Sequence, residues 1–356
     1  MAIVSVMRFN QYSGCICVDK ESWFLRNRKS FFSDNLYSCV PEEVRKSGVE
    51  LFLGGTGYPP FHYEVYLMCK NYMEQYLSSC NSNYGSLKVE DLARAVLKAF
   101  QHVHTRRINN RLNFFFGFNR DDFTAESYRK NGSIYQIKQE KIKKRAENII
   151  DMKEKSQDTT LVIPSNEACI AGIASDGFHA YCIKEQDGVL SFYSCGFDCL
   201  GAGKYAGGSE FAHTINKYNV EKRRKGLGKE EGVLTVFNAV IESWEHYSQI
   251  GGNIRLVLLS SEEHGEQMKE ISDSSSYICI ETVRAYREDL LTREDTLKII
   301  TSVIFEHMPW QKAEELMFEK TSDISELDKC LRNYKMDREK IKISYNDILK
   351  KENSAV

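Results

Sequence analysis

Apolar positions in the first part of the chain fall in short alternating runs that are typical of β-strands. The segment 3–19 contains two such runs, IVSVMRF and CICVD, on either side of the turn sequence NQYSG, and this pattern predicts a hairpin. A further strand is predicted at VELFLGGTG, which ends in a glycine turn. The chain therefore opens with strands.

Strand patterns return near residue 168, where CIAGIASDG, FHAYCIKEQDG and VLSFYSCGFDCLGAG follow one another. The turn sequences Ser-Asp-Gly at 175–177 and Gln-Asp-Gly at 186–188 favour tight hairpins, because glycine tolerates a positive φ. We predict a three-stranded antiparallel meander here and a last strand at GGNIRLVLLSS.

Apolar residues spaced three and four apart predict helices between these groups of strands. They cover 63–77, 86–104, 204–217 and 230–248. This order of strands and helix pairs favours two antiparallel sheets, each covered by two helices. Residues 262–356 are mostly charged and helix-like, with one apolar run at 297–305.

The segment after the second helix does not fit this order. RLNFFFGFNRDDF, at 111–123, has the aromatic content of a short strand. Residues 129–158 are highly charged, which predicts a solvated helix or a projecting excursion. We therefore predict one domain at 1–261, with an insertion at about 107–165, and a mostly helical extension at 262–356.

Composition narrows the class of protein. The 356 residues carry 48 basic and 50 acidic side chains, and this balance argues against a dedicated nucleic-acid binder. We find neither a secretory signal nor an apolar run near the roughly 20 residues of a membrane span, so we expect a soluble, cytoplasmic protein with no membrane partner. The 11 cysteines include no CxxC pair and predict buried, reduced thiols.

Five stretches, in this order, resemble proteasome β-type subunits of the N-terminal-nucleophile (Ntn) hydrolase superfamily. They lie within 2–105 and 169–261, and they are IVSVMRFNQYSGCICVD, LFLGGTG, CIAGIASDGFHAYCIKEQDG, FDCLGAGKYA, and EEGVLTVFNAVIESW followed by GGNIRLVLL. The resemblance implies an α+β fold, a four-layer αββα sandwich of two antiparallel sheets. It also implies self-association into rings or stacked rings, with a peptide or another protein as a further partner.

In this family the first residue of the mature chain is the nucleophile, and its own α-amine is the general base. Ala2 would stand at that position here, and its methyl group cannot attack a carbonyl. The family's activating lysine has no counterpart in register, since the nearest lysines are Lys29 and Lys46. The resemblance therefore implies the family fold without the residues that make it a threonine-type protease.

At most of the remaining family positions the expected residue type is also missing. The aspartate that ends the opening hairpin would be Asp19, one residue late. The serine of the Gly-Ser-Gly turn falls on Ala202, and the later aspartate and serine fall on Tyr247 and Ile250. We interpret the chain as a catalytically inactive, proteasome-like subunit.

Alternative nucleophiles stay open at this point. Thr159 and Thr160, in QDTTLVIP, resemble a propeptide junction, although Asp158 precedes them where self-cleaving members of the family have glycine. Exposing Ser5 or Cys15 as a new amino terminus would require removal of several residues and would destroy the first strand. Either route would give a threonine- or serine-type Ntn peptidase or amidase.

Two further patterns suggest other chemistry. GAGKYAGG, at 201–208, has the form of a glycine-rich phosphate loop, and Glu221 follows at a distance suited to a ribose contact. The tight hairpins before it argue against a parallel Rossmann sheet, so close packing of a helix explains the glycines better. His102 and His104 lie on different helix faces and favour polar helix-end residues over metal ligands. We expect no cofactor and no metal.

Overall fold

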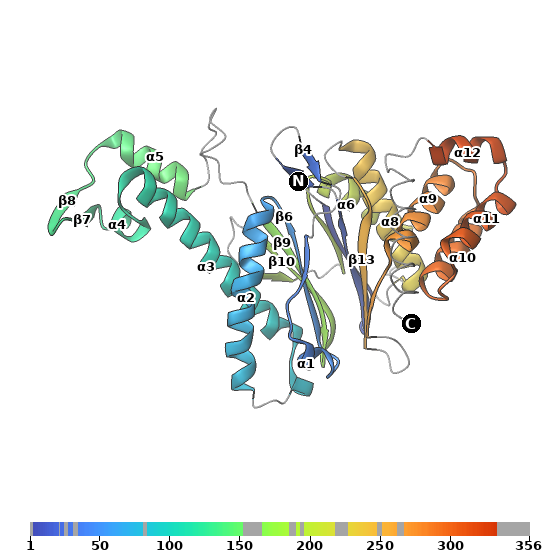
Figure 1. Cartoon of the computed structure of the whole chain (residues 1–356), viewed down its shortest axis with the longest axis horizontal. Coiled ribbons are helices and arrows are strands. Elements are labelled where there is room, and N and C mark those ends of the chain that lie inside the picture. The colour runs from blue at the N-terminus through green and yellow to red at the C-terminus, as the bar shows by residue number, and fades with distance from the viewer. Residues whose placement is uncertain are drawn as a thin grey trace, which may run out of the picture.

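The structure, a computed structural model, describes residues 3–20, 22–24, 28–30, 35–80, 84–151, 166–184, 190–192, 196–217, 227–247, 251–261 and 267–332. Two five-stranded sheets lie side by side in the middle of the molecule (Figure 1), and the strands within each are antiparallel. The antiparallel pairing that the tight turns predict is therefore confirmed.

The first sheet has the strand order β12–β1–β2–β13–β14. Its strands are β1 (Ile3–Asn10), β2 (Ser13–Asp19), β12 (Phe197–Gly201), β13 (Ile254–Ser260) and β14 (Met268–Glu270). The second sheet has the order β11–β10–β9–β6–β5. Its strands are β5 (Leu36–Ser38), β6 (Glu50–Thr56), β9 (Glu167–Ala174), β10 (Gly177–Lys184) and β11 (Leu190–Phe192). Separate hairpins are formed by β3 (Ser22–Phe24) with β4 (Arg28–Ser30), and by β7 (Ser127–Lys130) with β8 (Ser133–Gln136).

Helices cover the outer face of each sheet (Figure 1). The second sheet carries α2 (Pro59–Ser79) and α3 (Val89–Phe116), and the first carries α6 (Lys204–Asn216) and α8 (Lys229–His246). Beyond α8 follow α9 (Asp273–Arg287), α10 (Arg293–Ile304), α11 (Trp310–Lys320) and α12 (Ile324–Arg332). Shorter helices are α1 (Glu42–Arg45), α4 (Arg120–Thr124) and α5 (Glu140–Ile150), with a 3-10 turn at Tyr84–Ser86.

An apolar cluster combines side chains from both sheets. Val4 and Ile16 of the first sheet join Phe52, Ile173 and Phe178 of the second, and each is at most 2% exposed. Further clusters lie between each sheet and its helices. The cluster under α8 continues into α9, α10 and α11, so the predicted helical extension shares a core with the first sheet.

Two glycines in β6 explain why LFLGGTG contains small residues. A Cβ atom on Gly54 would lie 2.8 Å from Val4 of the first sheet, and one on Gly55 would lie 2.3 Å from the ring of His62 in α2. Both distances are below van der Waals contact, so only glycine lets the neighbouring sheet and the helix approach this closely. β6 is therefore closely packed on both of its faces.

The aromatic run at 111–123 is not a strand, so that prediction is wrong. Instead, α3 continues to Phe116 and ends at Gly117, whose φ of 76° lies in the left-handed region that terminates helices. Ile108 and Leu112 are four residues apart and both are buried, which keeps the helical period. Packing on one face of a helix overrides the strand propensity of the aromatic residues.

The predicted meander is wrong in its third strand. The residues VLSFYSCGFDCLGAG form two strands, and β11 pairs with β10 while β12 crosses to the first sheet and pairs with β1. In β12, Leu200 packs between the sheets and Cys199 packs toward α6 and α8. β12 fits the first sheet because one of its faces packs into the apolar cluster between the sheets and the other packs against α6 and α8. The turn at 186–188 lies outside the described residues.

In the part of the chain that the structure describes, no helix has the length and apolar character needed to cross a bilayer.

Candidate functional site

Asp19 closes the opening hairpin and ties three segments together at one end of the first sheet. Its Oδ1 accepts the backbone N–H of Ile3 at 2.8 Å, and its Oδ2 accepts that of Gly251 at 3.3 Å. The side chain is fully buried. A carboxylate that accepts backbone N–H groups in a buried position makes strong, charge-assisted hydrogen bonds. Asp19 therefore fixes where β1 begins and where the chain enters β13.

The turn after β12 meets the same end of the sheet. Gly201 pairs with Ile3, and its φ of 90° requires a glycine. Its N–H donates to Glu167 Oε2 at 3.2 Å, and Lys204 Nζ lies 3.5 Å from Glu167 Oε1. Glu167 begins β9 of the other sheet, so these contacts join the two sheets beside the start of the chain. Ala202 lies in this turn and packs against the cluster under α8.

Ser243 of α8 contacts the backbone of the turn between β12 and α6. Its hydroxyl is buried, and its single proton can be donated to the backbone oxygen of Gly203, at 3.1 Å, or to that of Ala239, at 2.8 Å. Tyr247 follows α8 directly and packs against the same apolar cluster as Ala202. These contacts assign a structural part to Ser243, which the sequence pattern alone does not single out.

Of the two lysines nearest in sequence to the family position, Lys46 is not brought to Asp19. Lys46 follows α1 and pairs with Glu42 at 3.2 Å on the surface, and α1 lies at the opposite end of the sheets from the start of β1 (Figure 1). Lys29 is part of β4. Lys204 contacts Glu167 beside the Gly201 turn, and sequence reasoning missed this lysine although it directly follows the GAG motif.

Four of the candidate residues, Ala2, Ile250, Thr159 and Thr160, lie outside the described residues, as does Glu221. Of the family positions, the structure brings Asp19 and the Ala202 turn to the same end of the first sheet, where Ile3 contacts Asp19 and pairs with Gly201.

Buried thiols surround the first strand, and their chemistry is suppressed. Cys15 and Cys17 of β2 and Cys199 of β12 are all at most 2% exposed. Burial raises the pKa of the Cys15 and Cys17 thiols, and it raises the pKa of Cys199 to about 12. The Cys199 sulfur lies 3.2 Å from Ser5 Oγ. Because the thiolate is the nucleophile, these thiols are inert at neutral pH.

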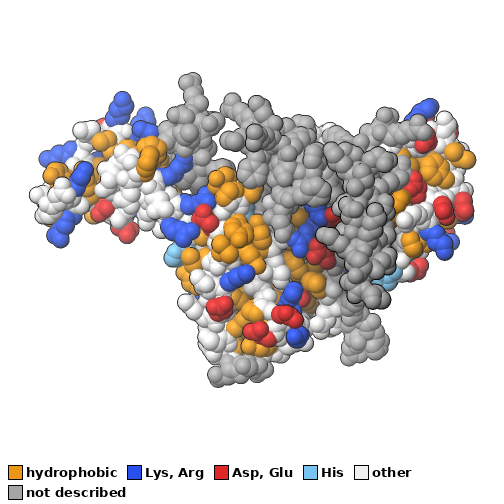
Figure 2. Space-filling model, viewed as in Figure 1, with side chains coloured by type: hydrophobic (Ala, Val, Ile, Leu, Met, Phe, Trp, Pro, Cys, Tyr) orange, Lys and Arg blue, Asp and Glu red, His pale blue; other side chains and the backbone are white. Residues whose placement is uncertain are grey.

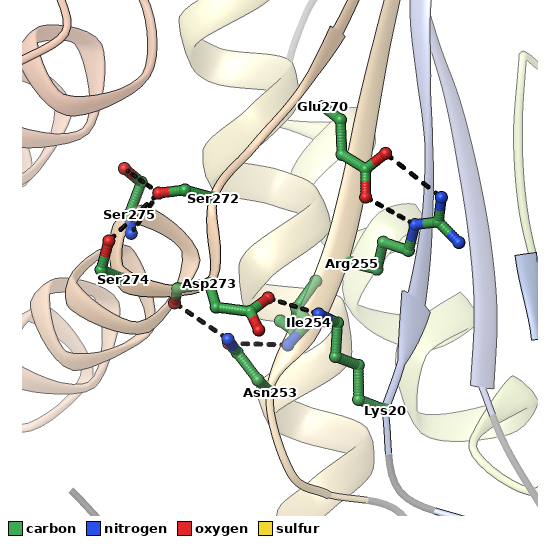
Figure 3. Close-up of polar contacts among 9 residues, drawn as sticks. All are labelled: Lys20, Asn253, Ile254, Arg255, Glu270, Ser272, Asp273, Ser274 and Ser275. Carbon is green, nitrogen blue, oxygen red and sulfur yellow. Dashed lines mark hydrogen bonds and ion pairs between the residues drawn. The ribbon is translucent and has the colours of Figure 1, made fainter. Parts of the chain in front are cut away.

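Lys20, directly after Asp19, connects this end of the sheet to the C-terminal helices (Figure 3). Its N–H donates to the backbone oxygen of Asn253 at 2.8 Å, and its ammonium forms an ion pair with Asp273 at the start of α9. The Asn253 amide donates to the Asp273 backbone oxygen at 2.9 Å. Ser272 caps α9 by accepting the N–H of Ser275 at 3.2 Å.

Figure 3 also shows an ion pair within the first sheet, between Arg255 and Glu270, and Arg255 extends from it to the edge strand of the second sheet. Arg255 of β13 makes a bidentate contact with Glu270 of β14, at 2.7 and 3.1 Å, and its Nη1 donates to the backbone oxygen of Leu36 in β5 at 2.7 Å. Planar guanidinium groups suit such paired contacts. Hydrogen bonds and ion pairs therefore connect several strands and a helix in the region around Asp19.

The glycine-rich segment 201–208 is explained by packing. A Cβ atom on Gly207 would lie 2.9 Å from both Cys199 Sγ and Ser243 Oγ, so the glycine lets α6 contact β12 and α8 closely. The sheet beneath it is antiparallel, unlike the parallel sheet of a Rossmann fold.

His102 and His104, the histidines considered as metal ligands, both lie on α3. His102 Nδ1 lies 3.3 Å from the hydroxyl of Tyr72 in α2. Within the described ranges, no three His, Cys, Asp or Glu side chains are grouped to hold a metal ion.

Comparisons with known proteins give a structural match alone. No family model matches the chain, and a search of curated proteins finds no match. Among solved structures, the chain is similar to a mutant of Anbu from Hyphomicrobium sp. strain MC1, with a TM-score of 0.50 and 11% identity. The match covers 81% of this chain and 94% of that chain. Anbu is a proteasome-related protein with an Ntn-hydrolase-like fold, and at this identity the likeness supports that general fold.

Proposed function

We propose that this chain is a divergent proteasome-like subunit that acts through self-association or protein interaction and does not hydrolyse peptides. In this proposal residues 1–261 form a four-layer αββα sandwich with an insertion at about 107–165, and 262–356 extend it. Support for the architecture comes from the two antiparallel sheets, the apolar cluster between them, the helix pair on each outer face, and the likeness to Anbu.

The hydrogen bond from Ile3 to Asp19 is the observation that carries the proposal. In the resembling family, the free amine and the hydroxyl or thiol of the first residue perform the reaction. Here Asp19 accepts the peptide N–H of Ile3, which anchors the start of β1 directly after Ala2, the residue at the family's nucleophile position. The Ile3 side chain is apolar and fully buried, and Ala2 before it has only a methyl group.

The surroundings of this position support the same conclusion. Position 202 carries alanine where the family has serine, so the turn offers a methyl group in place of a hydroxyl. The Ser243 hydroxyl lies within hydrogen-bond distance of two backbone oxygens. The thiols of Cys15, Cys17 and Cys199 are buried and protonated at neutral pH. These surroundings favour assembly over hydrolysis as the role of the fold.

Mass spectrometry of the mature protein tests the proposal. We expect an intact chain that begins at Met1 or Ala2. A new amino terminus at Thr159 or Thr160 would contradict the proposal, because it would create a free amine beside a threonine hydroxyl and favour a threonine-type Ntn peptidase or amidase. Self-association is tested separately, by sedimentation of the same preparation.

A further inference from the structure

The insertion forms a projecting arm, residues 108–150, which begins where α3 passes the end of α2 (Figure 1). Near this point Glu64, in the second turn of α2, joins the two helices by accepting from Arg106 at 2.8 Å and from Arg107 at 2.6 Å. Beyond Arg107, α3 continues to Phe116 and carries α4, the β7–β8 hairpin and α5 away from the sheets.

The arm has an apolar core of its own, so it keeps its shape away from the sheets. Ile108, Leu112, Phe118, Ala146 and Ile149 are each at most 2% exposed and form a cluster separate from the main core. Ring contacts extend this core along the arm through Phe114, Phe115, Phe116, Phe118, Tyr128 and Tyr135, with successive centroids 5.0 to 6.2 Å apart. Rigid aromatic surfaces of this kind lose little entropy on binding.

The surface of the arm combines apolar and cationic side chains. Phe114 is 82% exposed, Ile134 64% and Tyr135 47%. Lys and Arg side chains are scattered along its outline (Figure 2), and the arm carries nine basic residues against five acidic ones. Exposed aromatic and aliphatic side chains among basic ones favour contact with another protein.

The C-terminal helices lie at the opposite end of the long axis (Figure 1). Helices α9 to α12, residues 273–332, which we call the acidic end, contain 13 acidic and eight basic residues. Glu315 and Glu319 are exposed one turn apart on α11, and Ile324 of α12 is 64% exposed. The acidic end therefore offers both an apolar contact and the counter-charge for the arm.

We propose that the arm of one copy docks on the acidic end of a second copy of this chain. The two surfaces lie at opposite ends of one molecule (Figure 1), so each copy can receive an arm while its own arm is bound elsewhere. Such a head-to-tail contact closes into a ring or continues as a filament, according to the rotation between copies. This inference rests on the proposed self-association and names the surfaces that produce it.

Paired charge reversals on the full chain test the docking. R129E/K130E reverses two exposed cations on the tip of the arm, and E315K/E319K reverses two exposed carboxylates on α11. Each variant alone places like charges opposite each other, so we expect sedimentation velocity to report association weakened about tenfold or more. An equimolar mixture restores opposite charges at every contact and should associate as the parent does.

Salt and a matched variant provide the controls. Raising ionic strength from about 0.1 M to about 1 M shortens the screening length from about 10 Å to about 3 Å, so the parent should dissociate. R94E/K98E makes the same change on exposed residues of α3 outside the arm and should associate like the parent.

The outcomes separate the two claims. A parent protein that is monomeric at both salt concentrations overturns both the docking and the proposed self-association. A parent that associates overturns the docking alone if R129E/K130E or E315K/E319K associates equally well, or if their mixture does not reassociate.

Discussion

The carboxylate of Asp19 accepts the backbone N–H of Ile3, 16 residues earlier, at a distance of 2.8 Å. This bond joins the last residue of β2 to the first residue of β1, and the second oxygen of Asp19 holds Gly251 before β13. One buried side chain thus sets the ends of three segments. In the resembling family the first residue of the mature chain supplies a free amine, whereas Asp19 here accepts the peptide N–H of Ile3, directly after Ala2.

Removing this carboxylate is expected to destabilise the fold. D19A leaves two buried N–H groups without their acceptors and should lower the free energy of unfolding by about 3 kcal/mol, while D19N keeps one acceptor oxygen and should cost about half as much. Urea unfolding at neutral pH measures both. E74A, on an exposed position of α2, should stay within about 0.5 kcal/mol of the parent. A D19A protein as stable as the parent would show that Asp19 does not anchor these strands.

Adjacent glycines in α6 should respond in opposite directions. At Gly207 a Cβ atom would meet Cys199, Ser243 and the Ala239 backbone within 3.1 Å, so G207A should cost about 1–3 kcal/mol. At Gly208 a Cβ atom would meet nothing within 4 Å, so G208A should gain about 0.5–1 kcal/mol from helix propensity. Thermal unfolding of the two single variants provides the comparison. Equal effects of the two substitutions on stability would mean that α6 does not pack closely against β12 and α8.

Glu50 should make stability depend on pH. It is 4% exposed at the start of β6, with Arg45 3.8 Å away, and burial raises its pKa from 4.5 to about 7. The native state binds the proton more tightly than the unfolded chain, so this contribution to stability is complete below pH 4.5 and is lost as pH rises through 7. The loss amounts to at most about 3 kcal/mol.

E50Q removes this titration while keeping the shape of the side chain. We expect the variant to exceed the parent in stability at pH 8 by about 1–3 kcal/mol and to match it near pH 4. Denaturant unfolding across this range, with E74Q as an exposed control, measures the difference. Parallel pH profiles for the parent and E50Q would contradict the assignment.

The order of elements could be predicted from the sequence because strands and helices bury their faces with different periods. The segment 230–248 predicts a helix, and α8 covers Lys229–His246. The two wrong predictions, a strand at 111–123 and a single third strand of the meander, have one cause. The aromatic run at 111–116 and the strand β12 are decided by tertiary contacts, namely the separate core of the arm and the pairing of Gly201 with Ile3.

A residue of the candidate site could be predicted from the sequence only where it belongs to a recognisable local pattern. Asp19 ends an alternating strand and is recognisable by pattern. Glu167 and Lys204 are 37 residues apart and belong to different elements, so their contact beside Gly201 follows from how the sheets stack. Local patterns contain no information about such a contact, because each residue is an ordinary charged side chain in its own segment.

Peptide turnover by the purified, associated protein is the measurement that tests the central claim most directly. A panel of fluorogenic peptides should be hydrolysed no faster than in buffer, over a pH range that includes the titration of an α-amine near pH 8. D19N should give the same baseline. Hydrolysis above background that a single substitution near the start of β1 abolishes would contradict the account and establish this chain as a peptidase.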